Sequence, residues 1–314
     1  GSGNKWMRGD LTISGDLTVK NGVSFRMYPD NNNTLPHTLT GQAGKTFTLE
    51  NGANVLNATP SATTVAAPTG FGTYVLDPAS TYYLYSPAGV NQTLFTGNGI
   101  IYGNLYFRFA KTVTSDGVAT LDINGSFDLD VATYADNGKD IKVAGADIWL
   151  NNYTPSSSSI GFYLDGNINQ YVRDANNTDL IFGSVYCQGS NQKNFGDGND
   201  NITINGNFSN DAAVTTTSTN GRPWSFNGTS WANNGIFRQT GNTITFTNAG
   251  AVNINPGPSN ALNYFNNVVF SGAGTKTFIT NGSDINGTFT INAGTVNMGA
   301  FTHTIAGTIT NIAG

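Results

Sequence analysis

Two aspartates in a glycine-rich stretch have the residue types and spacing that suit a metal ion. Asp197 and Asp200 lie in the segment FGDGNDNIT, residues 195–203. The segment fits the calcium-binding nonapeptide Gly-Gly-x-Gly-x-Asp-x-apolar-x except at its first position. Glycine corners let backbone carbonyls and aspartate carboxylates converge on a hard cation. The sequence therefore suggests calcium, and no other cofactor, at this corner. Only one copy is present, so an ordinary polar corner is the alternative.

Two tryptophans are candidates for a sugar contact. Trp224 and Trp231 lie on either side of the turn sequence Asn227-Gly228, and they do not align with tryptophans in the repeats described below. Aromatic rings that face each other across a loop can stack on the apolar face of a sugar. We therefore predict a glycan-binding pair here, with packing at a corner as the alternative.

No set of residues predicts catalysis. Glycoside hydrolysis requires two carboxylates at a fixed separation, and acids do gather locally, as at Asp128 and Asp130. No basic residue recurs beside them, and the two histidines, His37 and His303, are far apart in the sequence. We therefore expect solvated strand and corner residues, and we assign no catalytic residue.

A short phrase, Ile-Asn-Gly-x-Phe, recurs three times, and the interval from the first copy to the second equals that from the second to the third. Equal intervals indicate duplication of a larger unit. We predict a structural role, in which Asn-Gly turns the chain while Ile and Phe enter the core. The three copies are Ile123-Asn124-Gly125-x-Phe127, Ile204-Asn205-Gly206-x-Phe208 and Ile285-Asn286-Gly287-x-Phe289.

Short alternating runs predict an all-β fold. Apolar and polar residues alternate with period two, as in Phe47 and Leu49 between Thr46, Thr48 and Glu50, and apolar residues at helical spacing never persist. Short strands between Asn, Gly and Ser corners favour an elongated parallel β-solenoid, a right-handed β-helix, over a string of β-sandwiches. Coils of roughly 20 residues would give about four coils for each repeat unit of about 81 residues.

The predicted organisation is one continuous body in four parts. Residues 1–69 form a divergent N-terminal solenoid segment. Repeat units 1, 2 and 3 follow at residues 70–153, 154–234 and 235–314. Repeats of this kind stack on one another instead of folding separately.

Composition limits the partners. Charged residues make up 11% of the 314 residues, the net charge is −5, and the 14 Lys and Arg residues form no cluster, so we expect no nucleic-acid partner. No apolar stretch is long enough for a membrane span. The single cysteine, Cys187, aligns with Phe107 and Phe270 of the other repeats, which predicts a buried residue and no intrachain disulfide.

The last repeat resembles a known family. Residues 264–278, YFNNVVFSGAGTKTF, and 285–297, INGTFTINAGTVN, are similar to the repeats of very large secreted Bacteroidota cell-surface proteins, including adhesins of gliding and type IX secreting bacteria. The likeness covers the third unit well, the first two units loosely, and residues 1–60. It implies an extracellular stalk or adhesin at the bacterial cell surface. That family's C-terminal secretion signal is not recognisable, so we expect a fragment of a longer array.

These observations predict a non-enzymatic, extracellular structural or adhesive segment, a rigid rod for attachment or display. We expect its partners to be adjacent repeats of a longer chain, further copies stacked end to end, or surface glycans. The alternatives are a carbohydrate-active β-helix enzyme, either a polysaccharide lyase or a glycosidase, and a glycan-binding module. An enzyme requires a cleft with converging acids and bases, whereas a binding module requires exposed aromatic residues.

Overall fold

The computed structural model describes residues 3–27, 37–57, 65–66, 68–85, 91–108, 112–129, 133–174, 178–197, 201–218 and 221–311. Within these ranges every regular element is a β-strand and no helix is present, as predicted. Accordingly, the described part of the chain holds no helix able to span a membrane. Contacts divide the chain into two compact units, Gly1–Thr154 (unit 1) and Pro155–Gly314 (unit 2).

The described residues of unit 1 form five parallel sheets. The first sheet of unit 1 joins β1 (Gly3–Trp6), β4 (Val23–Arg26), β7 (Asn54–Asn57), β10 (Thr81–Tyr85), β13 (Asn104–Arg108), β16 (Phe127–Asp128) and β19 (Asp147–Trp149). The others join β2 (Leu11–Thr12) to β5 (Leu39–Thr40); β3 (Leu17–Val19), β6 (Thr46–Leu49) and β9 (Thr73–Leu76); β8 (Val65–Ala66), β11 (Gln92–Leu94), β14 (Thr112–Ser115) and β17 (Thr133–Ala135); and β12 (Ile101–Tyr102), β15 (Leu121–Ile123) and β18 (Ile141–Val143).

The described residues of unit 2 form four parallel sheets. The first sheet of unit 2 joins β20 (Gly161–Leu164), β23 (Ser184–Cys187), β26 (Phe208–Asn210), β29 (Ser230–Asn233), β32 (Val252–Asn255), β34 (Thr275–Phe278) and β37 (Thr295–Asn297). The second joins β21 (Gln170–Arg173), β24 (Asn191–Asp197), β27 (Val214–Ser218) and β30 (Ile236–Gln239). The third joins β22 (Leu180–Phe182), β25 (Ile202–Ile204), β28 (Trp224–Phe226), β31 (Thr243–Phe246), β33 (Asn267–Phe270), β36 (Phe289–Ile291) and β39 (Ile309–Asn311), and the fourth joins β35 (Asp284–Ile285) to β38 (Thr304–Ile305).

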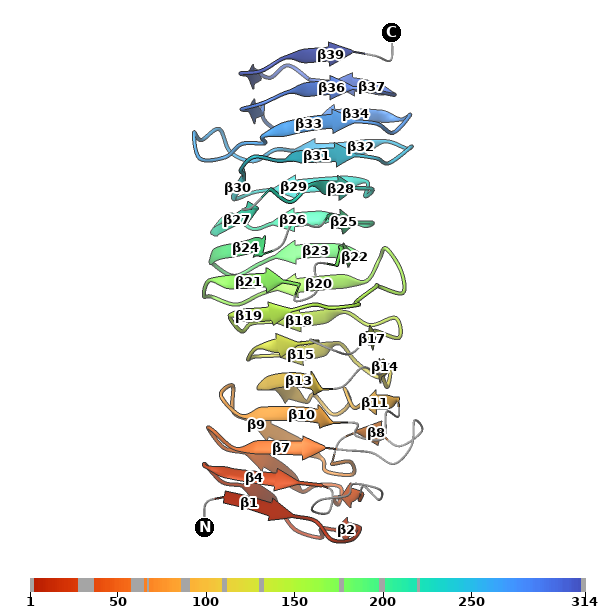
Figure 1. The fold of residues 1–314 in the computed structure, drawn as a ribbon, viewed down its shortest axis with the longest axis vertical. Coiled ribbons are helices and arrows are strands. Elements are labelled where there is room, and N and C mark those ends of the chain that lie inside the picture. The colour runs from red at the N-terminus through yellow and green to blue at the C-terminus, as the bar shows by residue number, and fades with distance from the viewer. Residues whose placement is uncertain are drawn as a thin grey trace. The chain divides into compact units, whose positions relative to one another are not determined.

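Strands that neighbour one another in a sheet come from successive coils of the chain. In unit 1, β1, β4, β7, β10 and β13 lie one above another (Figure 1). Gly3 pairs with Val23, whereas Ser24 pairs with Asn54, so the second of these coils is longer than the first. In unit 2, Phe208 pairs with Trp231 in the same parallel manner. This arrangement confirms the predicted parallel β-solenoid, although its coils differ in length instead of repeating uniformly.

The core is a set of columns in which inward side chains of successive coils touch. In unit 1, Leu105 pairs with Phe127 and Phe127 with Ile148, and all three side chains are fully buried. Each such side chain contributes roughly 1.5–3 kcal/mol through removal of apolar surface from water. Cys187 also lies in the core, as predicted, and burial raises the pKa of its thiol to about 12.

The Ile-Asn-Gly-x-Phe phrase joins one strand to the next at a corner. In each copy the Ile ends one strand, the Phe begins the next, and both are buried. The glycines Gly125, Gly206 and Gly287 do not have positive φ angles, so they are not needed for an unusual backbone conformation. A Cβ at each of them would instead overlap atoms of an adjacent coil. Glycine is required here because the coils pack backbone against backbone.

The variable position of the phrase takes part in a second contact between coils. The backbone N–H of Ser126 donates to Asn104 Oδ1 at 2.9 Å, and that of Thr288 donates to Asn267 Oδ1 at 2.8 Å. The backbone N–H of Asn207 donates to Ser184 Oγ at 2.9 Å in the same way. A side-chain oxygen of one coil thus satisfies a corner amide of the next, which would otherwise lack a partner.

Within unit 2 the interval between copies of the phrase is not a whole number of coils. Phe208 begins β26 in the first sheet, whereas Phe289 begins β36 in the third sheet. The second and third copies of the phrase therefore turn the chain at different corners. The equal intervals thus record a duplication of sequence, and the copies do not occupy equivalent positions in the solenoid.

Close stacking of the coils can be tested at Gly145. A Cβ at this position would overlap the carbonyl group of Gly125 one coil away. We expect Gly145→Ala to lower the free energy of unfolding by about 2 kcal/mol, since overpacked sites cost about this much. Gly15 has open space around its Cβ direction, so Gly15→Ala should change the value by less than about 0.5 kcal/mol. Urea denaturation measures both, and equal stabilities would contradict the packing.

Candidate binding surface

Seven outward-facing residues form one column across the first sheet of unit 1, and we call this column the ladder. Each member pairs in register with the next, and each side chain is half-buried. The ladder consists of Trp6 on β1, Arg26 on β4, Leu56 on β7, Tyr83 on β10, Tyr106 on β13, Asp128 on β16 and Trp149 on β19.

Strand alternation places the ladder outside the core. On β13, Leu105 and Phe107 are fully buried, and Tyr106 between them has the opposite orientation. Because successive side chains of a strand point to opposite faces, the same pairing that aligns the core columns also aligns the outward residues. The ladder nevertheless consists mainly of aromatic and aliphatic side chains. Residues of these types usually occupy the inward positions of a strand.

Arg108 holds the centre of the ladder in place. Its Cζ lies 5.0 Å from the ring centroid of Tyr106 and 5.9 Å from that of Tyr83. Its Nη1 donates to Asp128 Oδ2 at 2.8 Å, which fixes the guanidinium between the two rings and the carboxylate. A further cation–π contact places Arg26 Cζ 4.5 Å from the ring centroid of Trp6. Such contacts contribute about 0.5–1 kcal/mol each at exposed sites.

Tyr83 and Tyr106 lie side by side at the centre of the ladder. The ring centroids of Tyr83 and Tyr106 lie 5.3 Å apart. Burial raises the pKa of Tyr106 above its usual value, the neighbouring Tyr83 and Asp128 raise it further, and Arg108 opposes the shift. The ladder thus offers aromatic rings, tyrosine hydroxyl groups and one fixed ion pair along the sheet. This combination suits an extended ligand with apolar faces and hydroxyl groups, such as a glycan.

The predicted calcium residues lie partly outside the described residues. Asp197 ends β24, where its backbone pairs with Arg173, and Asp200 lies outside the described residues. In the described part of the chain no three His, Cys, Asp or Glu side chains gather closely enough to hold a metal ion. Calcium at Asp197 and Asp200 stays a prediction.

The predicted sugar contact at Trp224 and Trp231 was wrong. Both indoles are buried in unit 2, with 1% and 0% of their surface exposed. Trp231 stacks on Phe208 with ring centroids 4.1 Å apart, and Trp224 Nε1 donates to Ser218 Oγ at 3.0 Å. Lack of alignment between repeats suggested exposure, but each tryptophan occupies an inward position of its strand. Both indoles pack in the core from the strands β28 and β29, whereas the alternative drawn from the sequence was packing at a corner.

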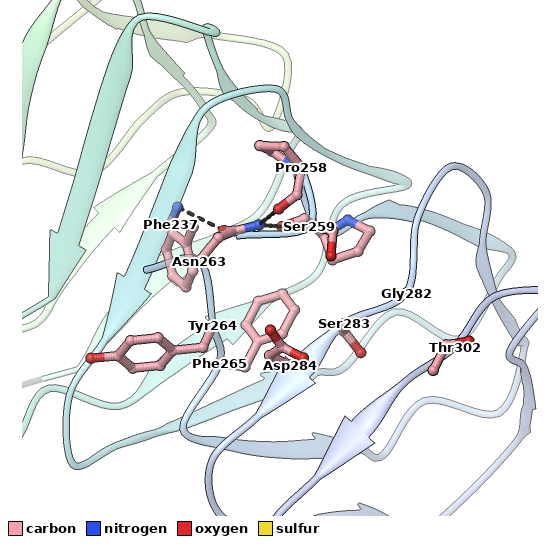
Figure 2. Close-up of a pocket in the computed structure, with 11 residues that line it drawn as sticks. Phe237, Pro258, Ser259, Asn263, Tyr264, Phe265, Gly282, Ser283, Asp284 and Thr302 are labelled. Atoms are coloured by element: carbon pink, nitrogen blue, oxygen red, sulfur yellow. Dashed lines mark hydrogen bonds between the residues drawn. The ribbon is translucent and has the colours of Figure 1, made fainter. Parts of the chain in front are cut away.

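A small cavity lies beside Asn263 in unit 2 (Figure 2). Its volume is about 40 Å³. Asn263 Oδ1 accepts the N–H of Phe237 at 2.9 Å, and its Nδ2 donates to the carbonyl of Pro258 at 2.9 Å. The buried amide therefore closes the backbone of a loop. A space of this volume holds about one water molecule and is too small for a sugar.

Ser283 and His303, which line and adjoin this cavity, form a pair that sequence reasoning missed. His303 Nδ1 lies 3.0 Å from Ser283 Oγ and accepts the Ser283 backbone N–H at 3.1 Å. Since Nδ1 is an acceptor, Nε2 carries the proton and donates to the Met298 carbonyl at 2.8 Å. The imidazole thus ties two turns together beside this small cavity.

Two buried lysines, Lys193 and Lys276, serve as internal cations in unit 2. Lys193 Nζ donates to Gln170 Oε1 at 2.6 Å and to a backbone carbonyl, and burial lowers its pKa. Lys276 Nζ donates to the carbonyls of Gly272 at 3.1 Å and Gly274 at 3.0 Å. Both ammonium groups satisfy carbonyls at coil corners, which is a structural role.

The described residues define a β-solenoid with one patterned outward column in unit 1. Compared with known proteins, the chain matches no family model, no curated protein and no solved structure. The surface itself is therefore the basis for a function.

The burial of Trp231 generates a direct test. We expect Trp231→Ala to lower the free energy of unfolding by about 3–5 kcal/mol, because it leaves a large cavity among aromatic rings. Trp231→Phe keeps most of that packing and should cost less than about 1.5 kcal/mol. Chemical denaturation distinguishes them. If Trp231→Ala lowered the free energy of unfolding by less than about 0.5 kcal/mol, as an ordinary surface substitution does, burial of Trp231 would be contradicted.

Proposed function

We propose that this chain is a non-enzymatic structural and adhesive segment of an extracellular protein at the bacterial cell surface. The ladder is the observation that carries the proposal. It places the half-buried side chains of Trp6, Tyr83, Tyr106 and Trp149 in one outward column, where a purely structural coil would have polar residues. Arg108 contacts the two tyrosines and pairs with Asp128. The ladder is the contact with the bound surface, and surface glycans are its ligands.

The sequence resemblance and the chemistry of the chain support an extracellular setting. The last repeat is similar to those of secreted Bacteroidota surface proteins, and the low charge and single buried cysteine suit a body held by backbone pairing. Parallel coils expose free backbone groups at the edge strands, which favours pairing with adjacent repeats or with another copy. The rest of the segment then acts as a rigid rod that positions the ladder for attachment or display.

A glycan array tests this function when ladder variants are compared with a matched control. We expect the Tyr83→Ala/Tyr106→Ala variant to lose affinity at least tenfold, since stacking on two rings contributes about 1.4 kcal/mol or more. Thr93 and Thr114 form an equivalent pair on β11 and β14, so Thr93→Ala/Thr114→Ala should bind like the unmodified protein.

Two results would contradict the proposal. One is unchanged glycan affinity in the tyrosine variant while its fold is intact by circular dichroism. The other is release of reducing ends or unsaturated sugars from a polysaccharide incubated with the protein, which would show the β-helix enzyme instead.

A further inference from the structure

A polar groove runs along one corner of unit 2, and we call it the corner groove. It lies where the third sheet turns into the first, between β25 and β26 and again between β28 and β29. Its volume is about 420 Å³, which is within the range of small-ligand sites. Its polar lining includes Ser158, Ser184, Asn207, Asn227, Thr229 and Asn248.

Two corner glycines, Gly206 and Gly228, line the groove. A Cβ at Gly206 would overlap the carbonyl oxygen of Ser158, and one at Gly228 would overlap the carbonyl oxygen of Gly206. The backbones of neighbouring coils therefore stack directly at the floor of the groove. Side chains on both sides of these glycines, Asn205, Asn207 and Asn227 among them, form the walls.

Hydrogen bonds fix part of the wall and leave the rest available. Asn207 Oδ1 accepts the N–H of Ser230 at 3.1 Å, and Asn248 Nδ2 donates to the carbonyls of Asn227 at 2.6 Å and Gly228 at 3.1 Å. By contrast, the Asn227 side chain is exposed. Its carboxamide group makes no hydrogen bond to any described residue. Rigid groups thus surround an amide that has both a donor and an acceptor to offer.

The lining contains no Asp, Glu, Lys or Arg. An anionic or cationic ligand would lose water here without gaining a countercharge, which is unfavourable. Hydroxyl and amide groups instead match a ligand rich in hydroxyl groups, because each hydroxyl both donates and accepts.

An apolar platform adjoins the groove. Tyr163 on β20 and Tyr186 on β23 stack with ring centroids 4.5 Å apart and an interplanar angle of 12°. The Tyr163 ring covers Gly161, which pairs with the groove residue Ser184. The two half-buried rings form an apolar outward surface that can pack against the C–H side of a sugar.

We propose that the corner groove and the Tyr163–Tyr186 platform bind a segment of a neutral oligosaccharide. The amides and hydroxyls of the groove bond to sugar hydroxyl groups, and the tyrosines support the apolar face of an adjoining sugar. This site lies wholly in unit 2 and is independent of the ladder.

Titration calorimetry of the full chain tests the site with linear glucan and mannan hexasaccharides and, as an anionic probe of the same length, hexagalacturonate. We expect a neutral hexasaccharide to bind, and Asn227→Ala and Tyr186→Ala each to weaken binding about fivefold or more. Asn201→Ala is the matched control, since Asn201 is an exposed asparagine of unit 2 outside the groove, and it should bind like the unmodified protein.

The outcomes separate this site from the ladder. Retained hexasaccharide binding in the Tyr83→Ala/Tyr106→Ala variant supports the groove, whatever that variant does on the glycan array. Absence of binding by both neutral hexasaccharides, unchanged affinity in Asn227→Ala and Tyr186→Ala, or equally tight binding of hexagalacturonate would overturn the proposal. Thermal melting confirms that each variant is folded.

Discussion

Backbone hydrogen bonds between successive parallel coils are the interaction on which both units depend. They fix the register of each strand against the next, so residues a whole coil apart in the sequence, such as Gly3 and Val23, become neighbours. A change of one residue in register would exchange the inward and outward faces of a strand. Core columns, corner contacts and the outward ladder are therefore consequences of one pairing.

Because of this pairing, inward positions, corners and outward positions of a coil need different kinds of residue. Inward columns such as Leu105, Phe127 and Ile148 exclude water and supply most of the stabilisation. Corners depend on glycine, because adjacent backbones leave no room for a side chain, and on side-chain oxygens that accept amides of the next coil. Outward columns contribute less to packing, so aromatic residues there are the best indicators of a partner.

Much of the fold could be predicted from the sequence, because period-two alternation and short strands between polar corners have few other solutions. The ladder could not be predicted. The stretch of chain between Arg26 and Leu56 is longer than that between Tyr83 and Tyr106, so no fixed period aligns the members of the ladder. Only the pairing itself brings them into one column.

The candidate site also shows where local patterns mislead. Trp224 was assigned to the surface from its absence in other repeats, although its spacing from Phe226 within one strand already indicated an inward position. Likewise, the glycine of the repeated phrase suggested a tight turn, whereas Gly206 is needed because a neighbouring coil approaches it. Contacts between coils decide both cases, and a single repeat does not contain them.

Disulfide trapping in the ladder tests the register most directly. Neighbouring paired positions lie within the Cα separation that a disulfide spans, whereas positions two strands apart do not. The account predicts that Tyr83→Cys/Tyr106→Cys forms an intramolecular disulfide on mild oxidation and that Tyr83→Cys/Asp128→Cys does not. Native Cys187 is buried and does not interfere. Efficient bridging of the second pair, or none in the first, would contradict the column on which the proposed adhesive function depends.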